Sequence, residues 1–410
     1  MPVPTPTAAE AAADAFALAP GFRSSATACG LKKSGALDLA LVWADAPCAA
    51  AGVFTTNRVQ AAPVLVDRAA LAATGGRARG VLANAGCANA VTGERGMADA
   101  KRMQALGAGA AGGPPDEMLV LSTGVIGVFL DADKLAAGVR ALAGPEARHA
   151  PGAAARAICT TDTVPKVASV RAELPGGAVT LAGFCKGAGM IHPNMATMLA
   201  ILTTDATIEP ARLDRALRAA VEHSFNRISV DGDMSTNDTV LVLASGASGV
   251  RVDDASEPAF TAALAAACAS LARQIARDGE GATRLVELRI TGGATGRQSH
   301  RVGDAIACSP LVKTAIHGND PNWGRILAAA GYSGEAVEPE RVRLWFGEAD
   351  RLQLLDRGLP VAFDKAAASA LLREDPAIVH LDLGLGDAAA VVWTCDFSAD
   401  YVRINADYTT

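Results

Sequence analysis

One segment of the chain combines residue types that could perform covalent chemistry. It runs Lys186-Gly-Ala-Gly-Met-Ile-His-Pro-Asn-Met-Ala-Thr197, so a glycine-rich loop and a proline turn lead into an apolar run that Thr197 begins. A threonine hydroxyl is a poor nucleophile until a base removes its proton. A free α-amine on the same residue can be that base, because its pKa is about 8. That amine exists only if the chain is cut between Ala196 and Thr197; otherwise the pattern describes a loop entering a core strand.

Six further blocks accompany this segment in a fixed order along the chain. With it they resemble the ornithine acetyltransferase family over almost the whole length of the sequence. The blocks are Ser122-Thr-Gly-Val-Ile-Gly127, Thr160-Thr-Asp-Thr163, Ser224-Phe-Asn-Arg-Ile-Ser-Val-Asp-Gly-Asp-Met-Ser-Thr-Asn-Asp238, Asp278-Gly-Glu-Gly-Ala-Thr283, His317-Gly-Asn-Asp-Pro-Asn-Trp-Gly-Arg325 and Ile404-Asn-Ala-Asp-Tyr-Thr-Thr410.

The resemblance implies an activity and a maturation step. The precursor would cut itself between Ala196 and Thr197 into an α chain (1–196) and a β chain (197–410) that stay associated. Thr197 would then take the acetyl group of N2-acetylornithine, and glutamate would accept it from the acetyl-enzyme. Attack on the acetyl group creates an oxyanion that needs donors already aimed at it. The family places this oxyanion hole at Thr123 and Gly124, although a plain glycine turn would explain the same two residues.

The resemblance also implies a substrate-binding set. This set consists of Thr160, Lys186, Thr197, Glu280, Asn405 and Thr410. The substrate carries a carboxylate and a distal ammonium, so a cation, an anion and neutral hydrogen-bonding groups suit it. Lys186 could equally be a solvated loop lysine, and Glu280 a surface turn residue between two glycines. His192 and His317 are not needed by the amine mechanism, and Cys159 and Cys185 have the character of packing residues.

Two other functions remain open on the sequence. The same self-made threonine nucleophile would serve an aminopeptidase or amidase in which water is the acceptor. The chain could also be an uncleaved α/β binding module without enzymatic activity. The opposite charges of Lys186 and Glu280 favour an amino-acid ligand over a peptide, and an SDS gel would separate a cleaved from an uncleaved chain.

Composition excludes several classes of protein. The chain has 410 residues and a formal net charge of −6, with 4% aromatic residues, so it lacks the basic and aromatic surface of a nucleic-acid binder. Its eight cysteines contain no C-x-x-C pair and its six histidines are dispersed, so we expect no metal. No basic leader and no run of about 18 apolar residues is present, so we expect a cytoplasmic protein without a membrane span.

A dinucleotide fingerprint occurs in the wrong context. Gly107-x-Gly109-x-x-Gly112 follows a predicted helix rather than a strand and continues into Gly113-Pro114-Pro115, which cannot open a phosphate-binding helix. We therefore expect no bound cofactor, while acetyl-CoA stays a candidate substrate. The remaining expected partners are small amino-acid substrates and a second copy of the cleaved protomer, as α2β2.

The hydrophobic pattern predicts a mixed α/β chain. The resemblance implies an αββα sandwich of the N-terminal-nucleophile type, with Thr197 heading a central strand, followed by a smaller α/β domain. We place the boundary near 283, giving domains 1–283 and 284–410, with the C-terminal tail returning to the active site. The first 30 residues suggest a loose arm. Predicted strands cover 36–43, 79–84, 118–122, 167–173, 178–185, 197–202 and 284–290; predicted helices cover 95–106, 131–143, 210–223, 257–278, 302–316 and 322–331.

Overall fold

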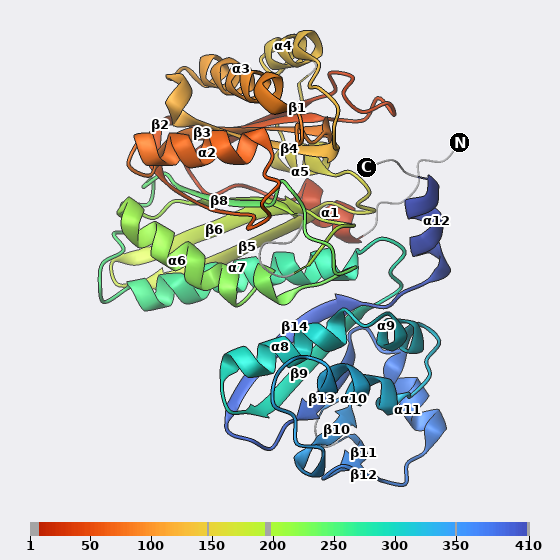
Figure 1. Cartoon of the computed structure of the whole chain (residues 1–410). Coiled ribbons are helices and arrows are strands. Elements are labelled where there is room, and N and C mark those ends of the chain that lie inside the picture. Colours follow the sequence, from red (N-terminus) through yellow and green to blue (C-terminus); the bar gives the residue numbers. More distant parts are fainter. Residues whose placement is uncertain (1–7, 146, 193–197, 349–350, 408–410) are drawn as a thin grey trace.

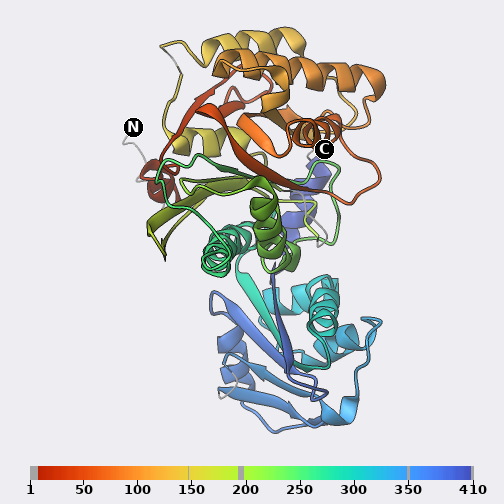
Figure 2. The ribbon, with the colours of Figure 1, turned by 90° about the vertical axis from the view of Figure 1, so that its left-hand side faces the viewer.

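The computed structural model describes residues 8–145, 147–192, 198–348 and 351–407, which form two lobes, one above the other (Figures 1 and 2). The larger lobe contains helices α1 (Ala8–Asp14), α2 (Ala62–Ala73), α3 (Gly93–Ala111), α4 (Ala132–Ala141), α5 (Pro151–Ile158), α6 (Pro210–Glu222) and α7 (Glu257–Arg277). Its strands are β1 (Phe22–Thr27), β2 (Leu39–Phe54), β3 (Arg77–Cys87), β4 (Met118–Val125), β5 (Lys166–Leu174), β6 (Gly177–Lys186), β7 (Leu199–Thr204) and β8 (Thr239–Ala244).

One hydrogen-bonded sheet runs through the larger lobe in the order β4-β3-β2-β8-β7-β6-β5, with β1 paired to β2. The long strand β2 joins its two halves. Residues 39–43 pair with β1 and β3, the register shifts between Trp43 and Cys48, and residues 49–54 pair with β8. Such an irregularity bends a strand and increases its twist, which lets the two halves of the sheet face each other.

Alternation along the strands sorts apolar side chains into separate cores. Leu41 points toward α3 and α4, whereas its neighbour Val42 points into the space between the two half-sheets. On the other half-sheet, Ile201 points into that central space and Leu202 points toward α6 and α7. Helix, half-sheet, half-sheet and helix therefore follow one another, which confirms the αββα sandwich.

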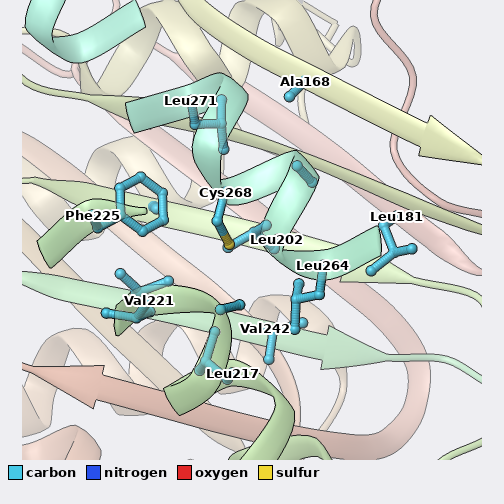
Figure 3. Close-up of a cluster of buried hydrophobic side chains, with 14 of the residues drawn as sticks. Ala168, Leu181, Leu202, Leu217, Val221, Phe225, Val242, Leu264, Cys268 and Leu271 are labelled. Carbon is cyan, nitrogen blue, oxygen red and sulfur yellow. The ribbon is translucent and has the colours of Figure 1, made fainter. Parts of the chain in front are cut away.

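The core between α6, α7 and the second half-sheet is shown in Figure 3. Leu264, Cys268 and Leu271 of α7 meet Leu202 and other strand residues there, and all are buried. Helix α7 is also long and apolar enough to cross a membrane by length and composition alone. Its apolar side chains fill this core, so it packs as a helix of the outer layer against the second half-sheet.

The smaller lobe is built on a second sheet, in the order β12-β11-β10-β13-β9-β14. Its elements are β9 (Leu285–Gly293), α8 (Gly296–Ala307), α9 (Pro310–His317), α10 (Trp323–Gly331), β10 (Arg343–Phe346), β11 (Leu352–Asp356), β12 (Leu359–Pro360), α11 (Lys365–Leu372), β13 (Ala377–Asp382) and β14 (Ala388–Cys395). After β14 the chain returns to the larger lobe, where α12 (Ala399–Asp407) lies beside it (Figure 1).

Several sequence-based expectations for single elements were wrong. The N-terminal arm contains α1 and β1, and β1 is held by a full antiparallel register with β2. The helix predicted over 302–316 is two helices, because Ser309 caps a new one that Pro310 begins. The apolar residues at 401–404 suggest a strand from the sequence alone, but they belong to α12. Helices α2 and α5 and strand β8 had no predicted counterpart.

We expect Phe225→Ala to destabilise the larger lobe by about 3–5 kcal/mol, because it removes a fully buried ring from the core beneath α7. Chemical denaturation of the variant and the parent measures the difference. Leu311→Ala is the control, since Leu311 is 61% exposed and its loss should change stability by no more than about 0.5 kcal/mol. Equal effects of the two changes would show that the core is not packed as described.

Candidate active site

A polar pocket opens in the larger lobe, where several strand ends and loops meet. It is lined by Ala88, Thr123, Gly124, Ile126, Thr160, Thr161, Lys186, Gly189, Met190, Asp231, Asp233, Ser235, Thr236, Asn237, Glu280, Tyr401 and Asn405. Six of the nine residues that the sequence suggested for the site therefore lie together: Thr123, Gly124, Thr160, Lys186, Glu280 and Asn405. The other three, Ala196, Thr197 and Thr410, lie outside the described residues.

The end of β4 forms one wall of the pocket. Gly124 has φ 129°, and a Cβ there would stand 2.4 Å from the carbonyl carbon of Gly86 and 2.6 Å from the nitrogen of Cys87. No side chain fits, so this corner needs glycine. The ladder between β3 and β4 is also irregular at Gly86 and Cys87. Such bulges are common beside active sites because they redirect backbone and side chains.

The adjacent ends of strands β6, β7 and β8 form a second wall of the pocket. The register pairs Lys186 with Leu199, and Leu199 with Thr239. Met198, which directly precedes β7, is 1% exposed, and its N–H donates to Asp238 Oδ1 over 3.1 Å. The chain that follows the predicted nucleophile is therefore fixed in the middle of the sheet.

Lys186 places a cation in the pocket wall. It is only 3% exposed, and the hydrogen bonds found among the described residues include none from its ammonium. Burial lowers the pKa of Lys186, and the charges of Asp162 and Glu280 offset part of that effect. A buried cation of this kind is well suited to an anionic group of a ligand, which would supply the missing acceptors.

Glu280 places an anion across the pocket, in the turn that follows α7. Its N–H donates to Ala188 O over 3.2 Å, and its Oε2 accepts from Asn405 Nδ2 over 2.8 Å. A Cβ on Gly189 would lie 2.3 Å from Glu280 Oε2, so glycine lets this carboxylate approach the loop. Asn405 lies on α12, so a residue from the end of the chain contributes to this part of the pocket.

A buried ion cluster holds the loops that carry Thr160 and Lys186. Lys166 is fully buried, and its Nζ lies 2.6 Å from both Asp162 Oδ1 and Asp278 Oδ2. Asp162 also accepts from the backbone N–H groups of Thr160, over 3.0 Å, and Gly187, over 2.7 Å. Asp278 directly precedes the Gly279–Gly281 turn, so the cluster connects three segments of the pocket.

The charges in this cluster stabilise one another. Burial by itself raises the pKa of Asp162, but Lys166, Lys186 and the Gly187 N–H outweigh burial and hold it well below its usual value. Burial likewise lowers the pKa of Lys166, and the two carboxylates outweigh burial and raise it. Asp162 and Lys166 are therefore both charged at neutral pH, which is tolerable in the interior because the two charges are paired and hydrogen-bonded.

The loop that follows Lys186 is held in an unusual conformation over residues 187–192. Ala188 has φ 87° and Met190 has φ 61°, a region that non-glycine residues rarely adopt. Asp231 secures this loop, since its carboxylate accepts from the N–H groups of Met190, over 2.6 Å, and Ile191, over 2.8 Å. Strain of this kind persists where the surrounding contacts impose it, and it is concentrated at functional sites.

The histidines and cysteines near the site have other partners. His192 Nδ1 lies 3.4 Å from Ser229 Oγ and 3.3 Å from Cys308 Sγ, while His317 Nδ1 lies 2.7 Å from Asp396 Oδ2. Neither histidine lines the pocket. Cys185 is buried in the core beneath α7, and Cys159 Sγ lies 3.3 Å from Ala155 O.

The glycines of the rejected dinucleotide motif lie in and directly after α3.

Sequence reasoning missed part of the site. It gave no role to the ion cluster, to Asp231 or to Asn237, and it did not place Tyr401 in the wall. The sequence contained a signal for some of these residues. The block 224–238, which contains Asp231 and Asn237, is one of those that carry the family resemblance, and Asp162 and Lys166 are four residues apart with opposite charge. Nothing in the sequence indicated that Asp278, over 100 residues away, completes the cluster.

The fold and the pocket define an α/β protein with an αββα sandwich and a polar site of opposite charges. The ArgJ family model matches residues 23–410, and the chain belongs to the ArgJ family. It is 50% identical to the arginine biosynthesis bifunctional protein ArgJ of Symbiobacterium thermophilum, over 95% of this chain and 97% of the relative. It is 48% identical to the ArgJ of Geobacter sulfurreducens, over 95% and 99%.

A crystal structure of ArgJ from Bacillus halodurans is also similar. Its chain is 44% identical in sequence, the match covers 50% of this chain and 97% of that chain, and the TM-score is 0.48.

We expect Lys166→Met to destabilise the protein by about 3–5 kcal/mol, because it leaves two buried carboxylates without their cation. The enzymatic activity of the pocket should fall as well, because Asp162 positions the backbone N–H groups of Thr160 and Gly187. Denaturation curves at neutral pH measure the first effect. The contribution of Asp162 should be present at neutral pH and be lost in acid, as the pH falls through its lowered pKa and the folded carboxylate takes up a proton.

Lys134→Met is the matched control for Lys166→Met. Lys134 lies 3.9 Å from Asp131, and both side chains are about half exposed, so this ion pair contributes little. A Lys166→Met protein as stable as Lys134→Met would contradict the description of the cluster.

Proposed function

We propose that this chain is an acetyltransferase of arginine biosynthesis that moves an acetyl group from N2-acetylornithine to glutamate. One observation carries the proposal: the pocket combines Thr123 and Gly124 with a buried cation, Lys186, and a buried anion, Glu280. This is the charge pattern that an acylated amino acid with a carboxylate and a distal ammonium requires. The names of the relatives, arginine biosynthesis bifunctional proteins, agree with it.

The proposed reaction begins with cleavage between Ala196 and Thr197, which frees the α-amine of Thr197. That amine removes the hydroxyl proton as Thr197 Oγ1 attacks the acetyl carbonyl carbon. The oxyanion that forms receives hydrogen bonds at the Thr123–Gly124 corner. When it collapses, the C–N bond breaks, the nitrogen takes the proton and ornithine leaves. Glutamate then attacks the acetyl-threonine through its α-amine, which restores the hydroxyl and yields N-acetylglutamate.

The binding roles follow from charge. In the proposal, Lys186 holds a substrate carboxylate and Glu280 holds a substrate ammonium, while Thr160, Asn405 and Thr410 supply neutral hydrogen bonds. Acetyl-CoA stays a candidate acetyl donor, and no bound cofactor is required. The paired charges of Lys186 and Glu280 favour amino acids over peptides as ligands, so an aminopeptidase is the less favoured hypothesis for this pocket.

Cleavage at this place would leave the two chains joined by the sheet. Strand β6 would belong to the α chain and β7 to the β chain, yet the two pair over six residues, from Lys186–Leu199 to Leu181–Thr204. Strand β2 would likewise belong to the α chain and its partner β8 to the β chain. Both chains share one core, so we propose that they stay associated, with α2β2 as the expected assembly.

We expect Thr197→Ala to abolish both cleavage and acetyl transfer, because the attacking hydroxyl is absent. The parent should run on a denaturing gel as chains of 196 and 214 residues, from the residues before and after the cut in the 410-residue sequence, and the variant as one chain. Transfer from N2-acetylornithine to glutamate is measured in both proteins. Thr197→Ser keeps a hydroxyl and should retain some cleavage. An active parent that consists only of uncut chain would refute the mechanism.

We expect Thr123→Ala to lower kcat by about 100- to 1,000-fold with a much smaller change in KM, because the hydroxyl acts on charge that develops during the reaction. Steady-state kinetics with N2-acetylornithine as the varied substrate gives both constants. Thr123→Ser keeps the hydroxyl and should recover most of the loss. If Thr123→Ala has parental kcat and KM, Thr123 is only a turn residue.

A further inference from the structure

Two consecutive buried residues, Asn237 and Asp238, directly precede β8 and contact both walls of the pocket. Asn237 is 6% exposed and Asp238 is fully buried. Neither was assigned a role by sequence reasoning, and both belong to the conspicuous block 224–238. Polar side chains buried this deeply cost stability unless their hydrogen bonds are made, so their partners indicate what they do.

Asn237 holds the wall that contains the Thr123–Gly124 corner. Its Nδ2 donates to Ala88 O over 2.7 Å and to Ser122 O over 2.9 Å. Ser122 directly precedes Thr123, and Ala88 follows the irregular end of β3. One amide group therefore joins the ends of β3 and β4, and it uses both of its N–H donors to do so.

Asp238 holds the wall that contains the start of β7. Its Oδ1 accepts from Met198 N–H over 3.1 Å, and the next residue, Thr239, donates its N–H to Met198 O over 3.0 Å. The two backbone groups of Met198 are therefore both fixed from residues 238–239. Thr55 N–H donates to Asp238 O over 2.8 Å, which ties this segment to the end of β2.

The contact at Met198 needs an acceptor and no charge. Asp238 Oδ2 is buried and has no hydrogen-bond partner among the described residues. Burial raises the pKa of Asp238 well above its usual value, although the Met198 N–H, Lys186 and the hydroxyls of Ser235 and Thr55 oppose this. Burial therefore favours the neutral form of this carboxyl, and the hydrogen bond from Met198 N–H requires only an acceptor oxygen.

We infer that Asn237 and Asp238 are positioning residues that set the oxyanion corner and the strand following the nucleophile at a fixed separation. Adjacent side chains of one backbone segment hold the two walls, so a shift of one wall would strain the hydrogen bonds to the other. The inference rests on the proposed function, in which the nucleophile precedes Met198. Reacting groups displaced by about 1 Å can lose about 100-fold in rate, which makes such a spacer important.

The two residues respond oppositely to an exchange of amide and carboxyl. Asp238→Asn keeps an oxygen to accept the Met198 N–H and stays neutral, so it should preserve the contact. Asn237→Asp replaces the amide, the donor to Ala88 O and Ser122 O, with a carboxyl that cannot make both bonds, so it should break the contact. A general loss of stability would not preserve activity in Asp238→Asn while lowering it in Asn237→Asp.

The test measures kcat and KM for transfer from N2-acetylornithine to glutamate in the full chain. We expect Asp238→Ala, Asn237→Ala and Asn237→Asp to lower kcat at least about tenfold with KM within about twofold, and Asp238→Asn to stay within about threefold of the parent. Circular dichroism and melting temperature show whether each variant is folded.

Two buried side chains away from the pocket serve as matched controls. Asp67 is fully buried, accepts the Val120 N–H through Oδ1 over 2.7 Å and has an unpartnered Oδ2, as Asp238 does. Gln104 Nε2 donates to Met118 O over 3.0 Å at the other end of β4. Asp67→Ala and Gln104→Ala should lower the melting temperature comparably while leaving kcat at the parental value.

The outcomes separate this inference from the proposed function. A parent that transfers no acetyl group refutes the proposed function itself. If the parent is active, parental kcat in folded Asp238→Ala overturns the inference. So does an Asp238→Asn variant as slow as Asp238→Ala, because charge would then matter rather than the neutral acceptor. Equal loss of kcat in the Asp67 and Gln104 controls would also overturn it, since general destabilisation would account for the effect.

Discussion

The site depends on the position of β7, which is hydrogen-bonded on both sides within the sheet. Its parallel register with β8 and antiparallel register with β6 set Lys186, Leu199 and Thr239 level with one another. Backbone ladders of this kind are far more rigid than surface loops. The Thr123–Gly124 corner, the Lys186 cation and the residues entering β8 are all placed relative to this strand.

The chain maintains several charges in the interior around that strand, and this arrangement has a physical cost. Lys166 and Lys186 are both almost fully buried, as is Glu280, and isolated ions there would be strongly destabilising. The Lys166 cluster resolves its own charges through Asp162 and Asp278. Lys186 receives only partial compensation, from the charges of Asp162 and Glu280, and in the proposed function a substrate carboxylate completes it. In that proposal, Lys166 holds the site together and Lys186 binds the substrate.

The architecture has a second consequence for the pocket, because its walls come from distant parts of the chain. Asn405 on α12 bonds to Glu280 after the chain has completed the entire smaller lobe. A Cβ on Gly281 would stand 2.5 Å from the nitrogen of Tyr401, so the glycine turn after α7 allows the first turn of α12 to lie close. The smaller lobe therefore ends with a helix that contributes to a pocket of the larger one.

The sequence predicted many single strands and helices well, because hydrophobic periodicity reports burial directly, whereas the layered arrangement came from the family resemblance. Strands such as β6 and helices such as α7 were placed within one or two residues. The prediction failed where the local pattern and the tertiary contacts diverge. Residues 401–404 are apolar enough to suggest a strand, yet they belong to a helix. Strand β8 was not predicted, since polar residues directly precede it. The site residues came from resemblance to a family. The sequence contains a sign of the Asp162–Lys166 pair, but Asp278 and the partners of Asn237 and Asp238 could not be anticipated, because they are distant in sequence.

The most direct test of the account is the intact mass of the protein after mixing with N2-acetylornithine in the absence of glutamate. The account predicts that the chain beginning with Thr197 gains the mass of one acetyl group, that the chain ending at Ala196 does not, and that added glutamate removes the group as N-acetylglutamate appears. Steady formation of N-acetylglutamate by a protein that never carries the acetyl group would contradict it.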